Sequence, residues 1–121
     1  MQEDKIKMKK IKVATLTGPL LDYWVAKANE MAHVFIEGGA CWQMQHGDTK
    51  CPYSPSTDWS QGGPIIERER ISIHWDSYLG IWKSYADTSD PIKRIASGKT
   101  PLIAAMRLYV LSKFGEEVDE I

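Results

Sequence analysis

The sequence of 121 residues predicts an α+β fold, in which a mainly antiparallel sheet packs against two principal helices. Short β-prone segments occur in neighbouring pairs joined by turns, which is typical of antiparallel strands. Two other segments combine helix-start signals with apolar residues at helical spacing. No strand–helix–strand unit is repeated, so a parallel sheet is not favoured. The chain, residues 1–121, is expected to form a single domain, since domains of this length usually fold on their own.

The first expected element is a strand at the edge of the sheet, over residues 6–13. Apolar residues alternate with lysines in it, and the Lys9-Lys10 pair fits a bulge. The lysines form a solvated strand face in this interpretation, and a nucleic-acid patch is the alternative. An acidic tail, residues 116–120, would offset their charge if the two ends of the chain lie close together.

The first helix is expected to begin at Thr17, a natural N-cap, with Pro19 in its first turn, where a missing N–H costs nothing. Its apolar residues recur at the spacing of one buried helical face. They are Leu20, Leu21, Trp24, Val25 and Ala28.

The last helix carries the clearest signals. Thr100 is its expected N-cap, Pro101 its first residue, and Gly115 its C-cap, so that the helix ends at Phe114. The expected core combines residues from both helices, namely Leu21, Trp24, Met106, Tyr109 and Val110.

Two hairpins are expected between these helices. One joins residues 33–37 to residues 42–45 across Gly38-Gly39, and the other joins residues 72–75 to residues 81–86.

Three further stretches lack a clear period. Residues 47–64 are too rich in proline and glycine for a regular element, and an irregular connection of this length is usually functional or mobile. Residues 64–71 fit either a short helical turn or a strand. Residues 87–99 form a polar connection.

The composition narrows the classes of function. The formal net charge is −1, so the charge of the whole chain favours neither nucleic acid nor an anionic membrane. No apolar run has the length of a bilayer, and the first residues lack the apolar stretch of a signal peptide, so a cytosolic protein is expected. Cys41 and Cys51 are expected to be free thiols, because the cytosol is a reducing compartment. A zinc site that combines them with His46 is not favoured, because it lacks the usual spacing and a fourth ligand. No metal and no cofactor are predicted.

The most informative segment for function begins at Tyr53. Trp59 is a large ring among polar residues and is suited to stack on a base, and the amides of Gly62-Gly63 can approach an anion closely. Asp58 can accept from a ribose or an amino group, and Arg68 offers a forked donor to phosphate. These features predict a nucleotide-like pocket. The predicted ligand-binding residues are Tyr53, Ser54, Ser56, Thr57, Asp58, Trp59, Gly62, Gly63, Pro64, Ile65, Arg68 and Thr100.

A structural interpretation of the same segment remains open. Asp58 would then cap a local turn, Trp59 would fill the core, and Gly62-Gly63-Pro64 would form a turn. A second candidate anion site is the start of the last helix, where Gly98 and Lys99 precede the N-cap.

Catalytic signatures are weak. The three histidines have no metalloprotease spacing and no nucleophile in a glycine elbow. Glu67 and Glu69 flank Arg68, and such an alternation of charges is typical of a solvent-exposed face and not of a catalytic acid/base pair. We therefore expect a binding protein and not an enzyme.

Three strings stand out, namely Leu16-Thr17-Gly18 leading into residues 21–28, Tyr53 to Trp59 with residues 62–67, and Thr100 to Arg107. In this order they resemble the NinX-like family of small tailed-phage proteins. The likeness runs from about Lys12 to Gly115, and the sequence departs from the family pattern in residues 38–50 and 87–98. The resemblance implies a phage origin and a location in the cytoplasm of the bacterial host, and it implies no particular reaction.

Two functions follow as hypotheses. The first is sequestration of a nucleotide-derived signal made by host antiviral defence, which needs tight binding and no turnover. The alternative is an accessory factor of phage recombination or transcription, which uses the lysine-rich first strand to bind nucleic acid or a host protein. A homo-oligomer, with a dimer favoured, is expected because so short a chain often borrows surface to enclose a polar ligand.

Overall fold

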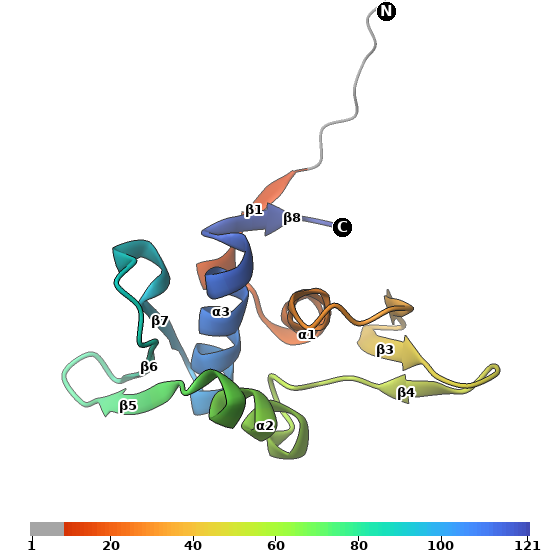
Figure 1. Cartoon of the computed structure of the whole chain (residues 1–121), viewed down its shortest axis with the longest axis horizontal. Coiled ribbons are helices and arrows are strands. Elements are labelled where there is room, and N and C mark those ends of the chain that lie inside the picture. The colour runs from red at the N-terminus through yellow and green to blue at the C-terminus, as the bar shows by residue number, and fades with distance from the viewer. Residues whose placement is uncertain (1–8) are drawn as a thin grey trace, which may run out of the picture.

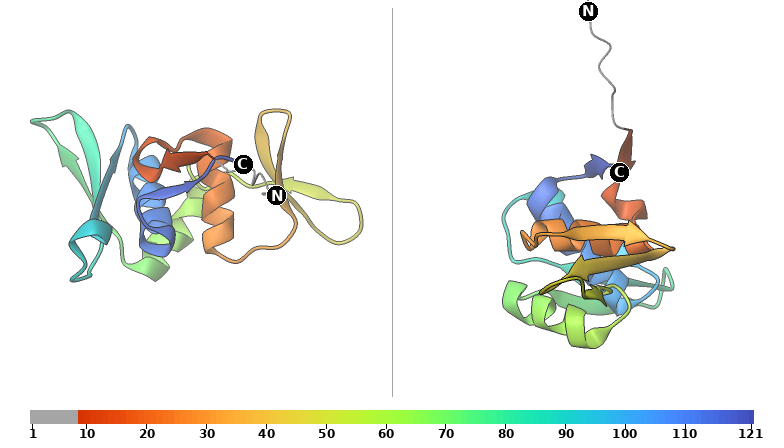
Figure 2. Two further views of the ribbon diagram at one scale, coloured as in Figure 1. Left: turned by 90° about the horizontal axis from the view of Figure 1, so that it is seen from above. Right: turned by 90° about the vertical axis from the view of Figure 1, so that its right-hand side faces the viewer.

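The computed structural model describes residues 9–121, and α3 lies at the centre of the fold (Figure 1). Strands flank the helices on two sides, and a two-stranded ribbon joins the two ends of the described chain (Figure 2). In chain order the elements are β1 (Lys10–Lys12), a 3-10 turn (Val13–Thr15), α1 (Gly18–Ala28), β2 (Val34–Glu37), β3 (Ala40–Met44), β4 (Lys50–Pro52), α2 (Trp59–Glu69), β5 (Ser72–Asp76), β6 (Ile81–Tyr85), a 3-10 turn (Pro91–Lys93), β7 (Ile95–Gly98), α3 (Pro101–Phe114) and β8 (Glu117–Asp119).

The α+β class and the antiparallel pairing are confirmed, but the prediction of one sheet against two helices is wrong. The strands form three separate antiparallel sheets, in the orders β1-β8, β2-β3-β4 and β5-β6-β7, and there are three α-helices in the described chain. Helix α1 contacts β2 and β3, whereas α3 contacts β5, β6 and β7. The two helices pack directly on each other, so the sheets are separated by the helices and cannot join.

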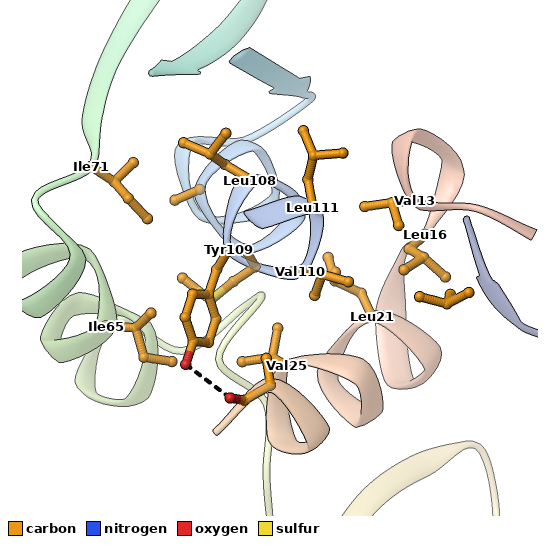
Figure 3. Packing of buried hydrophobic residues seen from close by; sticks show 14 residues of the cluster. Val13, Leu16, Leu21, Val25, Ile65, Ile71, Leu108, Tyr109, Val110 and Leu111 are labelled. Carbon is orange, nitrogen blue, oxygen red and sulfur yellow. Dashed lines mark hydrogen bonds between the residues drawn. The ribbon is translucent and has the colours of Figure 1, made fainter. Parts of the chain in front are cut away.

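The core surrounds α3 (Figure 3). Leu21, Met106 and Val110 have no exposed surface and Tyr109 is 3% exposed, as expected. Trp24 is only partly buried and packs at the margin of this core, edge-on to Phe114 with ring centroids 5.3 Å apart. Eight of the fourteen residues of α3 are buried. This helix is therefore apolar on most of its circumference.

The expected start of α1 and both expected limits of α3 are confirmed. Thr100 is the N-cap of α3, where its hydroxyl accepts a hydrogen bond from the Ile103 N–H at 3.1 Å, and Gly115 is the C-cap with φ 85°. Thr17 is the N-cap of α1, although its side chain makes no capping bond.

The two ends of the described chain pair with each other. Lys10 lies opposite Asp119, and their side chains form an ion pair at 2.7 Å, so the acidic tail does offset part of the lysine charge. The expected strand over residues 6–13 lies partly outside the described residues. Within them, β1 ends at Lys12, because Val13 begins a 3-10 turn that buries its side chain in the core.

Both predicted hairpins are confirmed, as β2–β3 and β5–β6. Two predicted irregular stretches contain regular elements instead. Residues 47–64 hold β4 and the beginning of α2, which continues through most of residues 64–71. Residues 87–99 hold a 3-10 turn and β7, which forms because β6 offers it a free edge.

No helix in the described part of the chain is long and apolar enough to span a membrane. Both cysteines are free thiols, and the register places Cys51 opposite Gln43. Burial raises the pKa of Cys41 to about 12, and the nearby Asp22 carboxylate adds a smaller contribution.

Candidate functional site

The segment that follows Tyr53 is attached to α1 by a buried carboxylate. Asp22 is 4% exposed and accepts a hydrogen bond from the Ser56 N–H at 2.8 Å. Burial raises the pKa of Asp22, and the hydrogen bond from the Ser56 amide opposes this shift. Pro55 and Ser56 are fully buried beside it. This hydrogen bond joins two of the three strings that resemble the family, the one over residues 21–28 and the one that begins at Tyr53. The second of these strings therefore has a structural role.

The beginning of α2 is held by two polar side chains. Asp58 caps the helix by accepting hydrogen bonds from the N–H and the hydroxyl of Ser60, at 2.9 and 2.7 Å. Gln61 accepts from the Ser54 N–H at 2.6 Å and donates to the Pro52 carbonyl at 3.2 Å. The structural interpretation of Asp58 as a cap is therefore confirmed.

The Gly62-Gly63-Pro64 string lies inside α2, which corrects the prediction of an irregular loop. The Gly62 N–H donates to the Asp58 carbonyl at 2.9 Å, so it belongs to the helix and not to an anion-binding nest. A side chain at position 62 would collide with the Pro55 carbonyl and would lie 2.6 Å from a methyl carbon of Leu102. Glycine is therefore needed for close packing at this position.

The remaining residues of that string have different surroundings. A side chain at Gly63 would meet only the Trp59 ring, at 4.0 Å. Pro64 is exposed, and Ile65 is 3% exposed in the core. Ile65 therefore packs in the interior.

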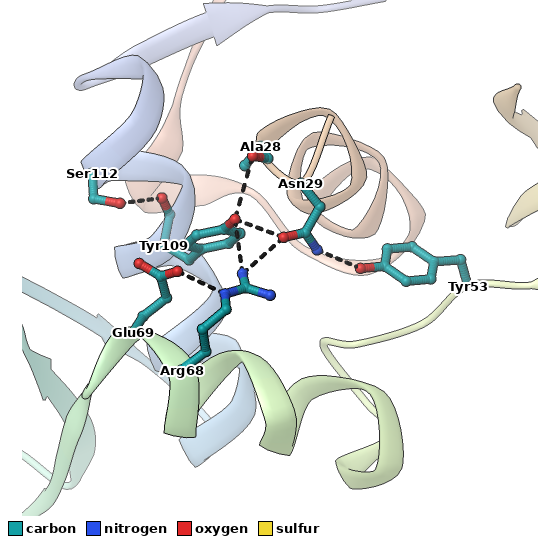
Figure 4. Close-up of polar contacts among 7 residues, drawn as sticks. All are labelled: Ala28, Asn29, Tyr53, Arg68, Glu69, Tyr109 and Ser112. Atoms are coloured by element: carbon teal, nitrogen blue, oxygen red, sulfur yellow. Dashed lines mark hydrogen bonds and ion pairs between the residues drawn. The ribbon is translucent and has the colours of Figure 1, made fainter. Parts of the chain in front are cut away.

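Arg68 belongs to a polar cluster between the three helices (Figure 4). Its Nη2 donates to the Asn29 side-chain oxygen at 2.8 Å and to the Tyr109 hydroxyl at 3.0 Å, and its Nε pairs with Glu69 at 2.9 Å. Asn29 in turn donates to the Tyr53 hydroxyl at 3.1 Å. Burial raises the pKa values of both tyrosines. Tyr53 and Arg68 are thus connected through Asn29, and the cluster ties the helices together.

Trp59 lies at a hollow where two helices begin. It is the first residue of α2, and its side chain is 55% exposed, so the interpretation of Trp59 as a core residue is wrong. The hollow has a volume of about 230 Å³. It is lined by Ser56, Thr57, Trp59, Thr100, Pro101, Leu102 and Ile103.

The predicted site residues therefore fall into separate places. Ser56, Thr57, Trp59 and Thr100 lie together at this hollow. Arg68 follows Trp59 by nine positions in the same helix, which places it about 13 Å further along the axis and on the opposite side. One pocket does not contain both side chains.

A larger hollow, of about 790 Å³, was missed by sequence reasoning. Arg107 lines it, and donates from Nε to the Leu16 carbonyl at 2.8 Å and from Nη1 to the Ser97 carbonyl at 2.9 Å. Burial lowers the pKa of this arginine. One sequence signal was available, because Arg107 is the single charged residue between Pro101 and Ser112.

No three histidine, cysteine or acidic side chains among residues 9–121 lie close enough together to hold a metal ion. The absence of a metal and of catalysis stays a prediction.

Comparison with known proteins gives one result for the family. The model of the family described as "Bacteriophage P22, NinX" matches residues 12–113, a range that includes all three strings singled out above. A search of curated proteins finds no match. The matched range covers far more than half of the sequence, and the chain therefore belongs to this NinX family of phage proteins.

Proposed function

We propose that this phage protein is an accessory binding protein that sequesters a nucleotide-derived signal of host antiviral defence, in the host cytoplasm and without converting it. The observation that carries this proposal is the exposed ring of Trp59 beside a hollow. Stacking of a nucleobase on an exposed aromatic ring contributes about 1–3 kcal/mol and works for every base.

The rim of the hollow supports binding of a ribonucleotide-like molecule. Thr57 and Thr100 line it with hydroxyl groups, which donate and accept hydrogen bonds. The Asp58 cap fixes the backbone that carries Trp59, so the ring needs little ordering when a ligand arrives. A rigid platform of this kind suits capture.

The position at two helix beginnings supports a phosphate close by. The N-terminal ends of α2 and α3 both border the hollow, and the positive end of a helix dipole stabilises an anion. The contribution is modest, because the Thr100 hydroxyl already occupies the Ile103 N–H. A phosphate here would therefore add to stacking and would not replace it.

The size of the hollow supports a homodimer as part of the proposal. Its volume of about 230 Å³ is below the ~300–1,000 Å³ of typical ligand pockets, so it fits a base and not a whole nucleotide. A second copy of the chain would cover the rest of the ligand, and cyclic dimers are the commonest homo-oligomers.

The test uses what the protein captures. Wild type, Trp59→Ala and Trp75→Ala are incubated with lysate of defence-activated cells, washed, heated and analysed by mass spectrometry. Trp75 is the matched control, because it is 52% exposed on β5, away from the hollow. We expect wild type and Trp75→Ala to release an intact nucleotide conjugate, and Trp59→Ala to release little.

Other outcomes would overturn the proposal. Release of a cleaved product would indicate an enzyme. If wild type releases nothing, or if both variants release equal amounts, Trp59 has no role in capture.

The alternative, a recombination or transcription factor that binds nucleic acid through β1, has less support. Lys10 is paired with Asp119, and Lys12 lies opposite Glu117 in the strand register. Binding to DNA that weakens steeply as salt rises would nevertheless favour it.

A further inference from the structure

We propose that the hollow beside Arg107 is a second ligand site, which takes a small molecule carrying one carboxylate on an apolar body. Nothing in the proposed function requires this site. Its residues come from β1, β6, β7, α3 and the segments next to them, and none of them lines the Trp59 hollow.

Arg107 is oriented but not neutralised. Two backbone carbonyls, of Leu16 and Ser97, accept from its Nε and Nη1. A guanidinium has five N–H donors, so these bonds fix the plane of the group and use only part of its fork. The unused part suits a planar carboxylate, which an arginine fork binds with two parallel hydrogen bonds.

The charge of Arg107 lacks an ionic partner within the described chain. No carboxylate among residues 9–121 forms an ion pair with it. The side chain is nevertheless half-buried where α3 passes Leu16 and β7. Partial burial of a charge is costly unless an opposite charge comes close, and a bound anion would supply that partner.

The surrounding charges indicate the charge of the ligand. Lys12 and Lys83 line the same hollow as Arg107, and Glu116 and Glu117 line it too. Lys83 is already paired with Asp76 at 3.3 Å, so the two remaining cations, Lys12 and Arg107, are matched in number by the two glutamates. This balance favours a singly charged anion over a polyphosphate, which would be repelled by both glutamates.

Most of the other residues that line the hollow are apolar, which accounts for the apolar body expected of the ligand. Ile92 and Ile95 are 54% and 48% exposed at this hollow, and Val13 and Leu111 are buried beside it. A molecule between them would remove aliphatic surface from water, which favours binding in proportion to the area covered. The volume of about 790 Å³ lies within the usual range for small-molecule pockets.

The test measures, by isothermal titration calorimetry, how tightly the full chain binds three small molecules: octanoate, octanol and inorganic pyrophosphate. Octanol has the same chain without the charge, and pyrophosphate has charge without the chain. We expect saturable binding of octanoate, and at least tenfold weaker binding of the other two. Equal affinity for octanol and octanoate would overturn the proposal.

Variants locate the site. Arg107→Lys keeps the charge but loses the two-carbonyl geometry, and we expect about tenfold weaker binding of octanoate. Since this change also removes two internal hydrogen bonds, Lys12→Gln is the second variant. It alters an exposed side chain, and we expect an unchanged thermal midpoint and about threefold weaker binding.

Two further variants complete the design. Lys50→Gln removes an exposed lysine on β4, outside this hollow, and should leave octanoate binding unchanged. Trp59→Ala should also leave it unchanged, which separates this site from the proposed nucleotide site. The proposal fails if Lys12→Gln and Lys50→Gln bind equally well, or if Trp59→Ala abolishes octanoate binding.

Discussion

The two hollows of this protein are built in opposite ways. The smaller one borders the string from Tyr53 to Trp59, most of whose polar groups have internal partners, and Thr57 and Trp59 are its exposed residues. The larger one gathers its charges from elements that are distant in sequence, around Arg107. The string from Tyr53 to Trp59, which is the most distinctive motif of the sequence, therefore mainly stabilises the fold. It has few groups available to bind a ligand, whereas the groups available at the larger hollow come from several separate elements.

The strongest test of the structural side of this comparison is Gly62→Ala. A methyl group at position 62 would meet the Pro55 carbonyl and the Leu102 side chain, and a backbone obstacle cannot rotate away. We expect a loss of about 1–3 kcal/mol in the free energy of unfolding, measured by urea titration. A neutral result would show that α2 packs less closely on the 53–58 segment than described.

The next largest effect on the free energy of unfolding is expected at Asp22. Asp22→Ala leaves the buried Ser56 N–H without an acceptor, and we expect a loss of about 1–3 kcal/mol in unfolding free energy. Asp22→Asn retains an acceptor oxygen and should lose much less. If both variants unfold alike, the hydrogen bond is not what holds the segment.

The buried Asp22 carboxylate also predicts that the stability of the protein depends on pH. Because burial raises the pKa of Asp22, its stabilising effect is fully present below the ordinary value of 3.8 and is lost as pH rises through the folded pKa. The stability of wild type relative to Asp22→Asn should therefore fall between pH 4 and pH 7. Urea unfolding of both proteins at the two pH values measures this difference, and a constant difference would contradict it.

Trp59→Ala tests the functional side. The ring is mostly exposed, so we expect the free energy of unfolding to change by less than about 1 kcal/mol. Binding of the released nucleotide should weaken by about 1–3 kcal/mol if a base stacks on the ring. Global unfolding of Trp59→Ala, with Trp75→Ala intact, would assign Trp59 to the structural group.

Gly63→Ala sharpens the contrast with its neighbour. Space is available at position 63, and alanine is favoured over glycine within a helix. We expect stabilisation by about 0.5–1 kcal/mol in the same urea titration. A loss like that of Gly62→Ala would mean that both glycines are needed for packing.

The smallest expected effect is that of Glu69→Gln. The ion pair between Arg68 and Glu69 is partly exposed, with 52% and 30% of the two side chains accessible, so water screens it. We expect a change of at most about 0.5 kcal/mol in unfolding free energy. A larger loss would show that Glu69 positions Arg68 for the rest of its cluster.

The parts of the fold that sequence predicted are those with local signals. Helix α3 has a threonine cap, a proline at its start and a glycine at its end, and each of these acts through adjacent backbone. The hairpins β2–β3 and β5–β6 likewise depend on neighbouring strands and a turn. Such elements can be found without knowledge of the tertiary structure.

The first part of α2 was missed, and its second part was left open between a helical turn and a strand, because the packing of this helix overrides its composition. Gly62, Gly63 and Pro64 are all unfavourable in a helix interior, but the contact of Gly62 with Pro55 is possible only for glycine. Asp58 followed three positions later by Gln61 was the signal for this helix start. Strand β7 was missed because it depends on β6 and α3.

The candidate site, too, was predictable only where a local sequence signal reveals it. The exposure of Trp59 could be suspected from its polar neighbours in the sequence. Separation of Trp59 from Arg68 follows only once α2 is known to be a helix. The Arg107 hollow requires the tertiary arrangement of several elements.

The ribbon of β1 and β8 has a consequence for the order of folding. Lys10 and Asp119 are 109 positions apart, so their pairing closes a loop of nearly the whole chain and incurs a large loss of chain entropy. The ribbon should form late and open early, and the amides of Val13 and Glu120, which bond across it, should exchange with deuterium before those of α3. Lys12 and Glu117 of this ribbon also border the Arg107 hollow, so one wall of that hollow belongs to the last part of the chain to assemble.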